Sequence, residues 1–184
     1  MSWWDGFVAA SRRLDGEEAT LQEAKPEEPT GGSAEDPDLT LVSVVQHAES
    51  EYSDALLILD PAIASAAASP YEDVHRVAMN LKAMAELARR RQEGKLGMSL
   101  RDAFGEAGID YRGGIAPTTS KRQRQQYFAT LPSGETVECH EHIVLGSSYD
   151  PRYCLRIYFT SRAPGEPRFV LAHVGRHFEV LSTT

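Results

Sequence analysis

The chain has 184 residues, a net charge of −8 and 41% apolar residues, a composition that fits one globular domain with a hydrophobic core. No apolar run reaches the roughly 18 residues that a membrane helix needs, and the N-terminal residues lack the basic and apolar regions of a secretory signal. These features argue against a membrane partner and predict a cytoplasmic protein, whose two cysteines are reduced thiols.

Charge is distributed unevenly along the chain. Residues 118–184 contain 8 of the 19 Lys and Arg residues but only 6 of the 27 Asp and Glu residues. The acidic chain as a whole argues against a non-specific nucleic-acid coat, because the neutralisation of phosphates needs clustered cations. The C-terminal third can still hold a local basic site.

The first 38 residues are predicted to form a short aromatic segment followed by a disordered acidic linker. Residues 15–38 contain nine acidic residues, one lysine and almost nothing apolar, so burial cannot repay the entropy of ordering them. Trp3, Trp4 and Phe7 precede this linker with roughly helical spacing. We interpret them as a docking segment for a protein partner or for the domain at 39–184; a frayed terminus is the alternative.

Three helices are predicted across residues 39–107. Apolar residues recur at three- and four-residue steps from Leu39 to Ala68, and Pro61 is expected to kink or divide this segment. The sequence Ser69-Pro-Tyr-Glu72 has the form of a capping box and predicts the start of a second helix. Ser99 is predicted to cap a third, short helix.

A loop at 111–126 separates these helices from a region of two-residue periodicity. Its basic residues Lys121, Arg122 and Arg124 form a candidate nucleic-acid-binding segment. The alternating region predicts strands joined by turns that contain Pro and Gly, at 127–131, 136–145, 154–160 and 168–174. Helices followed by strands predict an α+β fold, with the N-terminal helices packed on one face of a four-stranded antiparallel sheet at 127–178.

Alternation along these strands predicts a polar face of the sheet. Leu155, Ile157 and Phe159 form an apolar stripe, which places the two residues between them on the opposite face. Histidine suits proton transfer near neutral pH, and arginine can bind phosphate through two parallel hydrogen bonds. The face is therefore a candidate site for a phosphodiester, with the candidate residues His140, His142, Arg156, Tyr158, His173, Arg176 and His177.

Each of these residues taken singly is more typical of an ordinary solvated strand, and the hypothesis depends on their grouping. Four of the six histidines fall between residues 140 and 177. Zinc is the competing interpretation, since Cys139, His140 and His142 could supply nitrogen and sulfur ligands. However, Cys139 is expected to face away from His140, and the chain has no Cys-x-x-Cys pair, P-loop or Gly-x-Ser-x-Gly motif. We therefore predict neither a metal nor another cofactor.

The segment Leu155-Arg-Ile-Tyr-Phe159, followed after a short turn by Phe169-Val-Leu-Ala-His-Val-Gly175, resembles the C-terminal strands of RelE/ParE-type toxin domains. Those are small folds in which helices precede an antiparallel sheet. Many of them cut messenger RNA on the ribosome without a metal, using basic, tyrosine and histidine residues on the sheet. The resemblance implies that Arg156 binds phosphate, that Tyr158 and His173 transfer protons, and that Arg176 and His177 lie near the site.

The chain also departs from those toxins, which are typically shorter and basic. They lack an acidic tail of this kind, and the helical part at 39–107 has no counterpart of that size in them. The whole chain is also similar to helical-plus-β proteins of high-GC bacteria.

Two functions therefore stay open on the sequence. The first is an RNA-binding domain or metal-independent endoribonuclease of toxin-like fold, acting on RNA or the ribosome in a bacterial toxin–antitoxin system. The second is a non-catalytic protein-interaction module in a bacterial defence or regulatory system. The acidic linker, the aromatic segment and the lack of a strong catalytic motif favour this second function.

Overall fold

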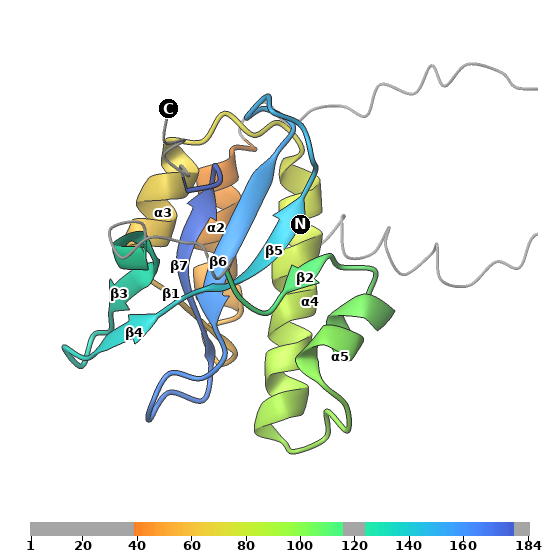
Figure 1. Ribbon diagram of the computed structural model, residues 1–184, viewed down its shortest axis with the longest axis vertical. Helices are drawn as coiled ribbons and strands as arrows, with labels where there is room; N and C mark the ends of the chain where they lie inside the picture. The colour runs from red at the N-terminus through yellow and green to blue at the C-terminus, as the bar shows by residue number, and fades with distance from the viewer. Residues whose placement is uncertain (1–38, 116–123, 179–184) are drawn as a thin grey trace, which may run out of the picture. The chain divides into compact units, whose positions relative to one another are not determined.

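A computed structural model describes residues 39–115 and 124–178 as an α+β structure built on a five-stranded sheet. The helices are α2 (Leu41–Glu51), α3 (Asp60–Ala67), α4 (Val74–Gln92) and α5 (Leu100–Glu106), with a 3-10 helix η1 (Gln125–Tyr127). The strands are β1 (Leu56–Ile58), β2 (Tyr111–Arg112), β3 (Phe128–Thr130), β4 (Thr136–Glu138), β5 (Glu141–Leu145), β6 (Leu155–Thr160) and β7 (Phe169–Gly175) (Figure 1). The main sheet has the strand order β1-β7-β6-β5-β2, and β3 and β4 form a second sheet.

Side-chain caps explain where the helices begin. The Ser99 hydroxyl accepts a hydrogen bond from the backbone N–H of Asp102, so the predicted cap of α5 is confirmed. The predicted capping box at Ser69–Glu72 is wrong, because α4 begins at Val74. The Asp73 carboxylate caps that helix instead, by accepting from the Arg76 N–H at 3.1 Å. The backbone N–H of Glu72 donates to the carbonyl of Arg152, which holds this segment against the β5–β6 connection, outside the helix.

The predicted helical segment 39–68 contains a strand that the helical periodicity did not indicate. Strand β1 separates α2 from α3 and pairs in parallel with β7, with Leu56 opposite Phe169. Pro61 lies in the first turn of α3, where its missing N–H costs no helical hydrogen bond. It therefore begins a helix and does not kink one.

The main sheet is mixed and five-stranded, which corrects the predicted four-stranded antiparallel sheet. Strands β5, β6 and β7 are antiparallel neighbours, as the alternating sequence predicted. Strand β1 adds a parallel edge to them. Strand β2 adds the other edge and comes from the start of the predicted loop at 111–126. Residues 116–123 of that loop lie outside the described residues.

The predicted strand 136–145 is divided between the two sheets. Strand β4 pairs with β3, and β5 pairs with β6 and β2. Cys139 and His140 lie between them, where the backbone N–H of Cys139 donates to the carbonyl of Tyr127. Burial still alternates across this break: Cys139 and Glu141 are buried, whereas His140 and His142 are half-buried, as the alternation in the sequence predicted.

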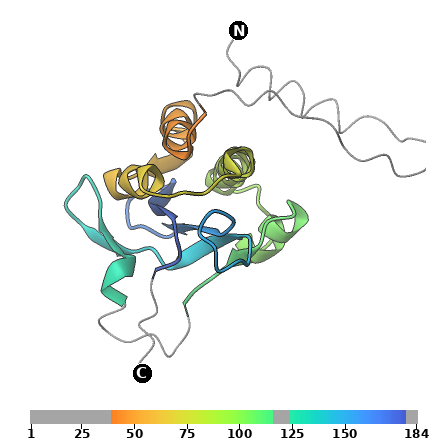
Figure 2. The ribbon, with the colours of Figure 1, turned by 90° about the horizontal axis from the view of Figure 1, so that it is seen from above.

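Helices α2, α3 and α4 lie on the same side of the main sheet, as the view in Figure 2 shows. Leu155, Ile157 and Phe159 are fully buried, which fits the predicted apolar stripe of β6. The other face of the sheet carries the residues that alternate with these along the strand, and it is turned toward the viewer in Figure 1. That face holds the residues that the sequence selected as a candidate site.

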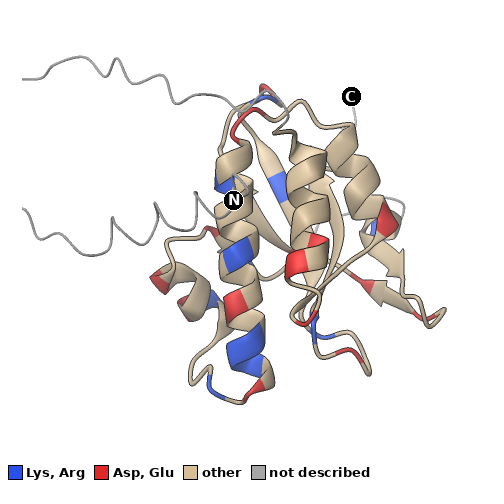
Figure 3. Ribbon diagram, turned by 180° about the vertical axis from the view of Figure 1, so that it is seen from behind, with Lys and Arg blue, Asp and Glu red and all other residues tan. Residues whose placement is uncertain are grey.

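The longest described helix, α4, has 19 residues and carries charged side chains along its exposed surface (Figure 3). Its last turn is basic, with Arg89, Arg90 and Arg91 beside the negative end of the helix dipole. Within the described part of the chain, no helix combines the length and the apolar character that crossing a membrane would require.

Candidate functional site

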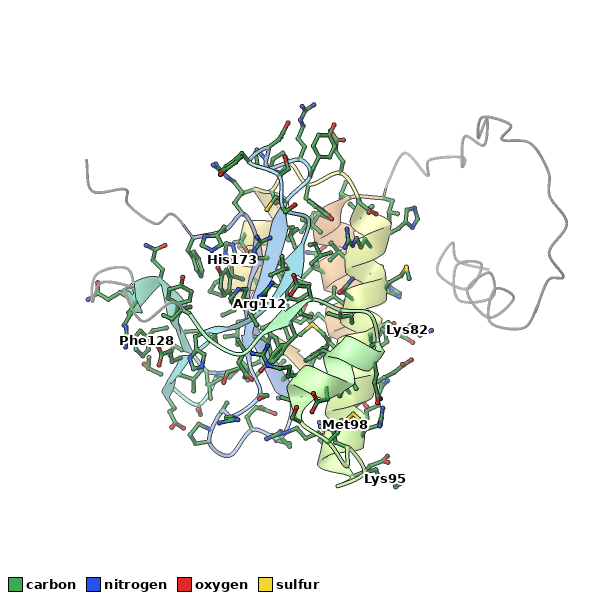
Figure 4. All side chains as sticks on the ribbon, turned by 45° about the vertical axis from the view of Figure 1, so that its right-hand side comes forward. Lys82, Lys95, Met98, Arg112, Phe128 and His173 are labelled. Carbon is green, nitrogen blue, oxygen red and sulfur yellow. The ribbon has the colours of Figure 1, made fainter. Side chains whose placement is uncertain are left out.

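Four side chains form a row across four neighbouring strands of the main sheet. Arg112 of β2 is the register partner of His142 in β5, His142 of Tyr158 in β6, and Tyr158 of His173 in β7. Directly opposed residues of antiparallel strands project from the same face. The Tyr158 ring lies 4.9 Å from the His142 ring and 5.8 Å from the His173 ring, measured between centroids. Figure 4 labels the two ends of this row, Arg112 and His173.

Tyr158 is the buried centre of the row, which corrects the expectation that it stands on an open face. Only 1% of its surface is exposed. The ring of Phe178 stacks on it at 4.6 Å, and the ring of Tyr127 meets it edge-on at 5.3 Å. His177 also packs against it, at 6.2 Å. Three histidine rings therefore pack around the buried ring of Tyr158.

The Tyr158 hydroxyl is poorly suited to proton transfer. It is buried and forms no hydrogen bond of good geometry with a described residue, although the Tyr127 hydroxyl and the Phe178 backbone are close enough to affect its pKa. Burial, with a smaller contribution from Tyr127, raises the pKa of Tyr158 far above its usual value. The hydroxyl therefore stays protonated over the physiological pH range.

Hydrogen bonds to the backbone set the tautomer of each histidine around Tyr158. His142 Nδ1 lies 3.1 Å from the carbonyl oxygen of His140, and His173 Nε2 lies 2.8 Å from that of Arg176. His177 Nδ1 lies 2.6 Å from the carbonyl oxygen of Phe178. A carbonyl oxygen only accepts, so these nitrogens carry the proton. In the neutral ring the other nitrogen of each histidine is then a proton acceptor.

Burial keeps two of these histidines neutral. It lowers the pKa of His142 below its ordinary value, and the charges of Arg156, His177 and Arg112 act in the same direction. Burial also lowers the pKa of His173, with the His177 charge adding to the effect. At neutral pH both side chains are uncharged bases beside a buried aromatic ring.

These two lowered pKa values make folding stability depend on pH. Below about pH 6.5, His142 and His173 bind protons in the unfolded chain but resist them in the folded chain, so stability falls as the pH decreases through this range. Above it, their contribution is constant. We expect urea unfolding between pH 5 and 8 to show this slope. In the variant His142→Asn/His173→Asn the slope should become shallower, and an unchanged slope would assign it to other groups.

Arg156 lies on the same face, two residues before Tyr158, and is only half-buried. Its Nη1 donates to the carbonyl oxygens of Leu155 and Gly146, at 2.9 and 3.2 Å, and contacts the Cys154 sulfur. Its Nε and Nη2 form no hydrogen bond with the described residues. The guanidinium is thus fixed on one side, and its remaining N–H groups are available to a ligand. The exposed Arg112 guanidinium is instead paired with Asp110, at 2.9 Å.

Other predicted site residues lie away from this row. His140 follows β4 outside the main sheet, and its ring faces Glu138, 3.8 Å away. Arg176 is exposed just beyond β7, and Arg124 is exposed at the start of η1. Four predicted groups lie outside the described residues: Lys121, Arg122, the aromatic segment with Trp3, Trp4 and Phe7, and the acidic linker.

Cys139 is buried, and burial raises the pKa of its thiol to about 12. A metal ligand must be the thiolate, which this environment disfavours. Among the described residues, no three His, Cys, Asp or Glu side chains are grouped so as to hold a metal ion.

Three participants in the site were not selected from the sequence. Arg112 was assigned to a loop, and its position in the row depends on the pairing of β2 with β5. Tyr127 and Phe178 cover Tyr158 from elements that are far apart in the chain. The only sequence feature that could have identified these two residues is that both are aromatic and lie at or near the ends of predicted strands. No family model, curated protein or solved structure gives a significant match to the chain.

Proposed function

We propose that the chain binds single-stranded RNA on the sheet face around Tyr158 and cleaves it without a metal. The observation that carries this proposal is the row of Arg112, His142, Tyr158 and His173, with Arg156 on the same face. This face combines the cation Arg156, which has free N–H groups, with several fixed proton acceptors. RNA cleavage through the 2′-hydroxyl needs these groups together.

Arg156 is assigned to the phosphate. Its Nη1 is held by the backbone on either side of the β5–β6 connection, so the guanidinium is preorganised and loses little freedom on binding. The N–H groups left free on Nε and Nη2 suit the paired acceptor oxygens of a phosphodiester. Arg112 is a weaker candidate, because its charge is already balanced by Asp110.

The histidines are assigned to proton transfer. The Nε2 of His142 is a proton acceptor in the neutral ring, which suits the removal of a proton from a 2′-hydroxyl. His177 is exposed and packs against Tyr158, and it is the candidate for protonating the leaving 5′-oxygen. His173 packs against both Tyr158 and Phe178 and is the alternative partner in either step.

Exposed aromatic residues next to the site add to the support for RNA. Tyr149 and Tyr153 lie in the β5–β6 connection, whose first residue, Gly146, contacts Arg156. Tyr149 is fully exposed, and the guanidinium of Arg152 lies 5.2 Å from the Tyr153 ring. Aromatic rings beside arginines are typical stacking surfaces for the bases of single-stranded nucleic acid.

Arg156→Ala tests this function. We expect it to weaken binding of a fluorescein-labelled single-stranded RNA at least about tenfold, and to reduce cleavage of ribosome-bound RNA in EDTA similarly, because a phosphate contact is lost. Its hydrogen bonds to the backbone predict a stability cost of about 1 kcal/mol. Fluorescence anisotropy, RNA profiles and urea unfolding measure the three quantities.

Arg90→Ala is the matched control, since Arg90 is an exposed arginine on α4, on the helical side of the sheet. Arg156→Lys separates charge from shape, because lysine keeps the charge without the planar pair of donors. Unchanged RNA binding and cleavage in Arg156→Ala, with a large loss of stability, would make Arg156 a structural residue and remove the proposal.

A further inference from the structure

A cleft of about 670 Å³ lies beside the row, between α5, β4 and the chain that follows β6. It contains none of the four row residues. The side chains that matter for its chemistry come from α5, β2, the β4–β5 junction and the residues after β6. They are Arg101, Tyr111, Glu138, His140, Glu141 and Arg162.

One wall of the cleft is a buried, fully bonded carboxylate. Glu141 is only 5% exposed, and its Oε1 accepts from the Tyr111 hydroxyl at 2.6 Å. The backbone N–H and the hydroxyl of Ser161 donate to the same carboxylate, at 2.5 and 3.1 Å. These bonds fix Tyr111 and the end of β6 in place, and they use the acceptor capacity of Glu141 within the protein.

Two arginines in the cleft have no protein partner among the described residues. Arg101 and Arg162 are exposed, and neither guanidinium forms a hydrogen bond or an ion pair with residues 39–115 or 124–178. Both line the cleft beside Tyr111, Arg101 from α5 and Arg162 from the residues after β6. Two unpaired guanidinium groups in one cleft suit the oxygens of a phosphate.

Another part of the cleft lining is acidic. Glu138, at the end of β4, is only partly buried, and its carboxylate faces His140 at 3.8 Å. A ligand that pairs with the two arginines and with Glu138 carries an anionic group at one end and N–H donors at the other. A nucleotide has these two features, with its phosphate and the N–H groups of its base. The cleft volume lies within the usual range for small-ligand sites, about 300–1,000 Å³.

The cleft is continuous with the proposed RNA face through the residues 140–142. The ring of His140 lines the cleft, and its backbone carbonyl accepts the hydrogen bond from His142 in the row. We infer that a strand of RNA bound at His142 reaches the cleft through His140. Sequence-selective proteins commonly take an unstacked base of single-stranded RNA into such a pocket.

We propose that this cleft binds one nucleotide of the RNA strand, with its phosphate at Arg101 and Arg162 and its base edge at Glu138. This inference rests on the proposed function, since it extends the RNA path from the sheet face. Guanine fits best, because its Watson–Crick edge presents two adjacent N–H donors that match the two oxygens of a carboxylate.

The test measures binding of GMP, AMP, CMP and UMP to the full chain by titration calorimetry, alongside the labelled RNA. We expect GMP to bind most tightly and Arg101→Ala/Arg162→Ala to weaken it at least about tenfold, with a loss of about fivefold or more in RNA affinity. Glu138→Gln should remove the preference for GMP. Arg90→Ala is the control, and none of these substitutions removes a buried side chain, so all of them should leave the melting temperature nearly unchanged.

The outcomes separate this inference from the proposed function. If GMP and RNA bind the double arginine variant as tightly as the wild type, or if no mononucleotide binds the wild type, the nucleotide cleft is wrong whatever Arg156→Ala does. If GMP binding depends on the two arginines while Arg156→Ala binds and cleaves RNA normally, the cleft stands and the sheet-face function fails. Binding of inorganic phosphate as tight as that of GMP would reduce the cleft to a simple anion site and overturn the base contact.

Discussion

Tyr158→Ala is expected to destabilise the fold by about 3–5 kcal/mol, whereas Tyr158→Phe should change stability by less than about 0.5 kcal/mol. Alanine removes the ring against which Tyr127, Phe178 and three histidines pack, and it leaves a cavity beneath the face. Phenylalanine keeps the ring and removes a buried hydroxyl that has no hydrogen bond to the described residues. Urea unfolding of the two variants beside the wild type measures the difference.

The same pair of variants separates two roles of Tyr158 in the proposed reaction. If the residue only positions the histidines, Tyr158→Phe should cleave RNA at close to the wild-type rate. A loss of cleavage by about a hundredfold or more in stably folded Tyr158→Phe would show that the hydroxyl itself takes part, as the resemblance to RelE/ParE-type toxins implies. Its raised pKa makes the positioning role the expected one.

Local sequence signals predicted those parts of the fold that depend on local interactions. The cap of α5 depends on Ser99 and a backbone group three residues away, so it is readable from the sequence. The alternation of β6 predicted its buried stripe, because Leu155, Ile157 and Phe159 all face the helices. Strand β1 could not be found in this way. Its three residues fit a helical pattern, and it becomes a strand by pairing with β7, more than 100 residues later.

The candidate site was also predicted only where it depends on local periodicity. Alternation and strand order placed His142, Tyr158 and His173 on one face, where the register puts them in a row. The alternation also continues through His140, but this residue precedes β5 and lies outside the main sheet, so it lines the neighbouring cleft and is not part of the row. The burial of Tyr158 depends on Tyr127 and Phe178, whose positions are set by tertiary packing and not by spacing in the sequence.

Gly146 links the local geometry of the β5–β6 connection to the proposed phosphate site. Its φ of +75° lies in the left-handed region, which residues other than glycine enter at a cost of roughly 1–2 kcal/mol. Its carbonyl oxygen accepts from Arg156 Nη1. A Cβ atom at this position would also collide with the backbone carbonyl oxygen of Tyr153, which cannot rotate away as a flexible side chain would. Steric clash is therefore added to backbone strain at the residue that anchors Arg156.

We expect Gly146→Ala to cost about 3 kcal/mol or more in the free energy of unfolding, because the connection must shift to relieve the clash. Gly165→Ala is the matched control: Gly165 has a φ of +69°, but a Cβ atom there meets nothing within 4 Å, so only the strain of about 1 kcal/mol applies. Urea unfolding compares the two variants.

RNA affinity gives the second measurement on the same two proteins. The shift in Gly146→Ala should move the Arg156 guanidinium, so the folded variant should bind the labelled RNA several-fold more weakly, because a small displacement weakens a paired phosphate contact. Gly165→Ala should bind like the wild type, since the β6–β7 turn does not contact Arg156. Equal RNA affinity in both variants, with the expected loss of stability in Gly146→Ala, would show that the geometry of this connection does not control the phosphate contact.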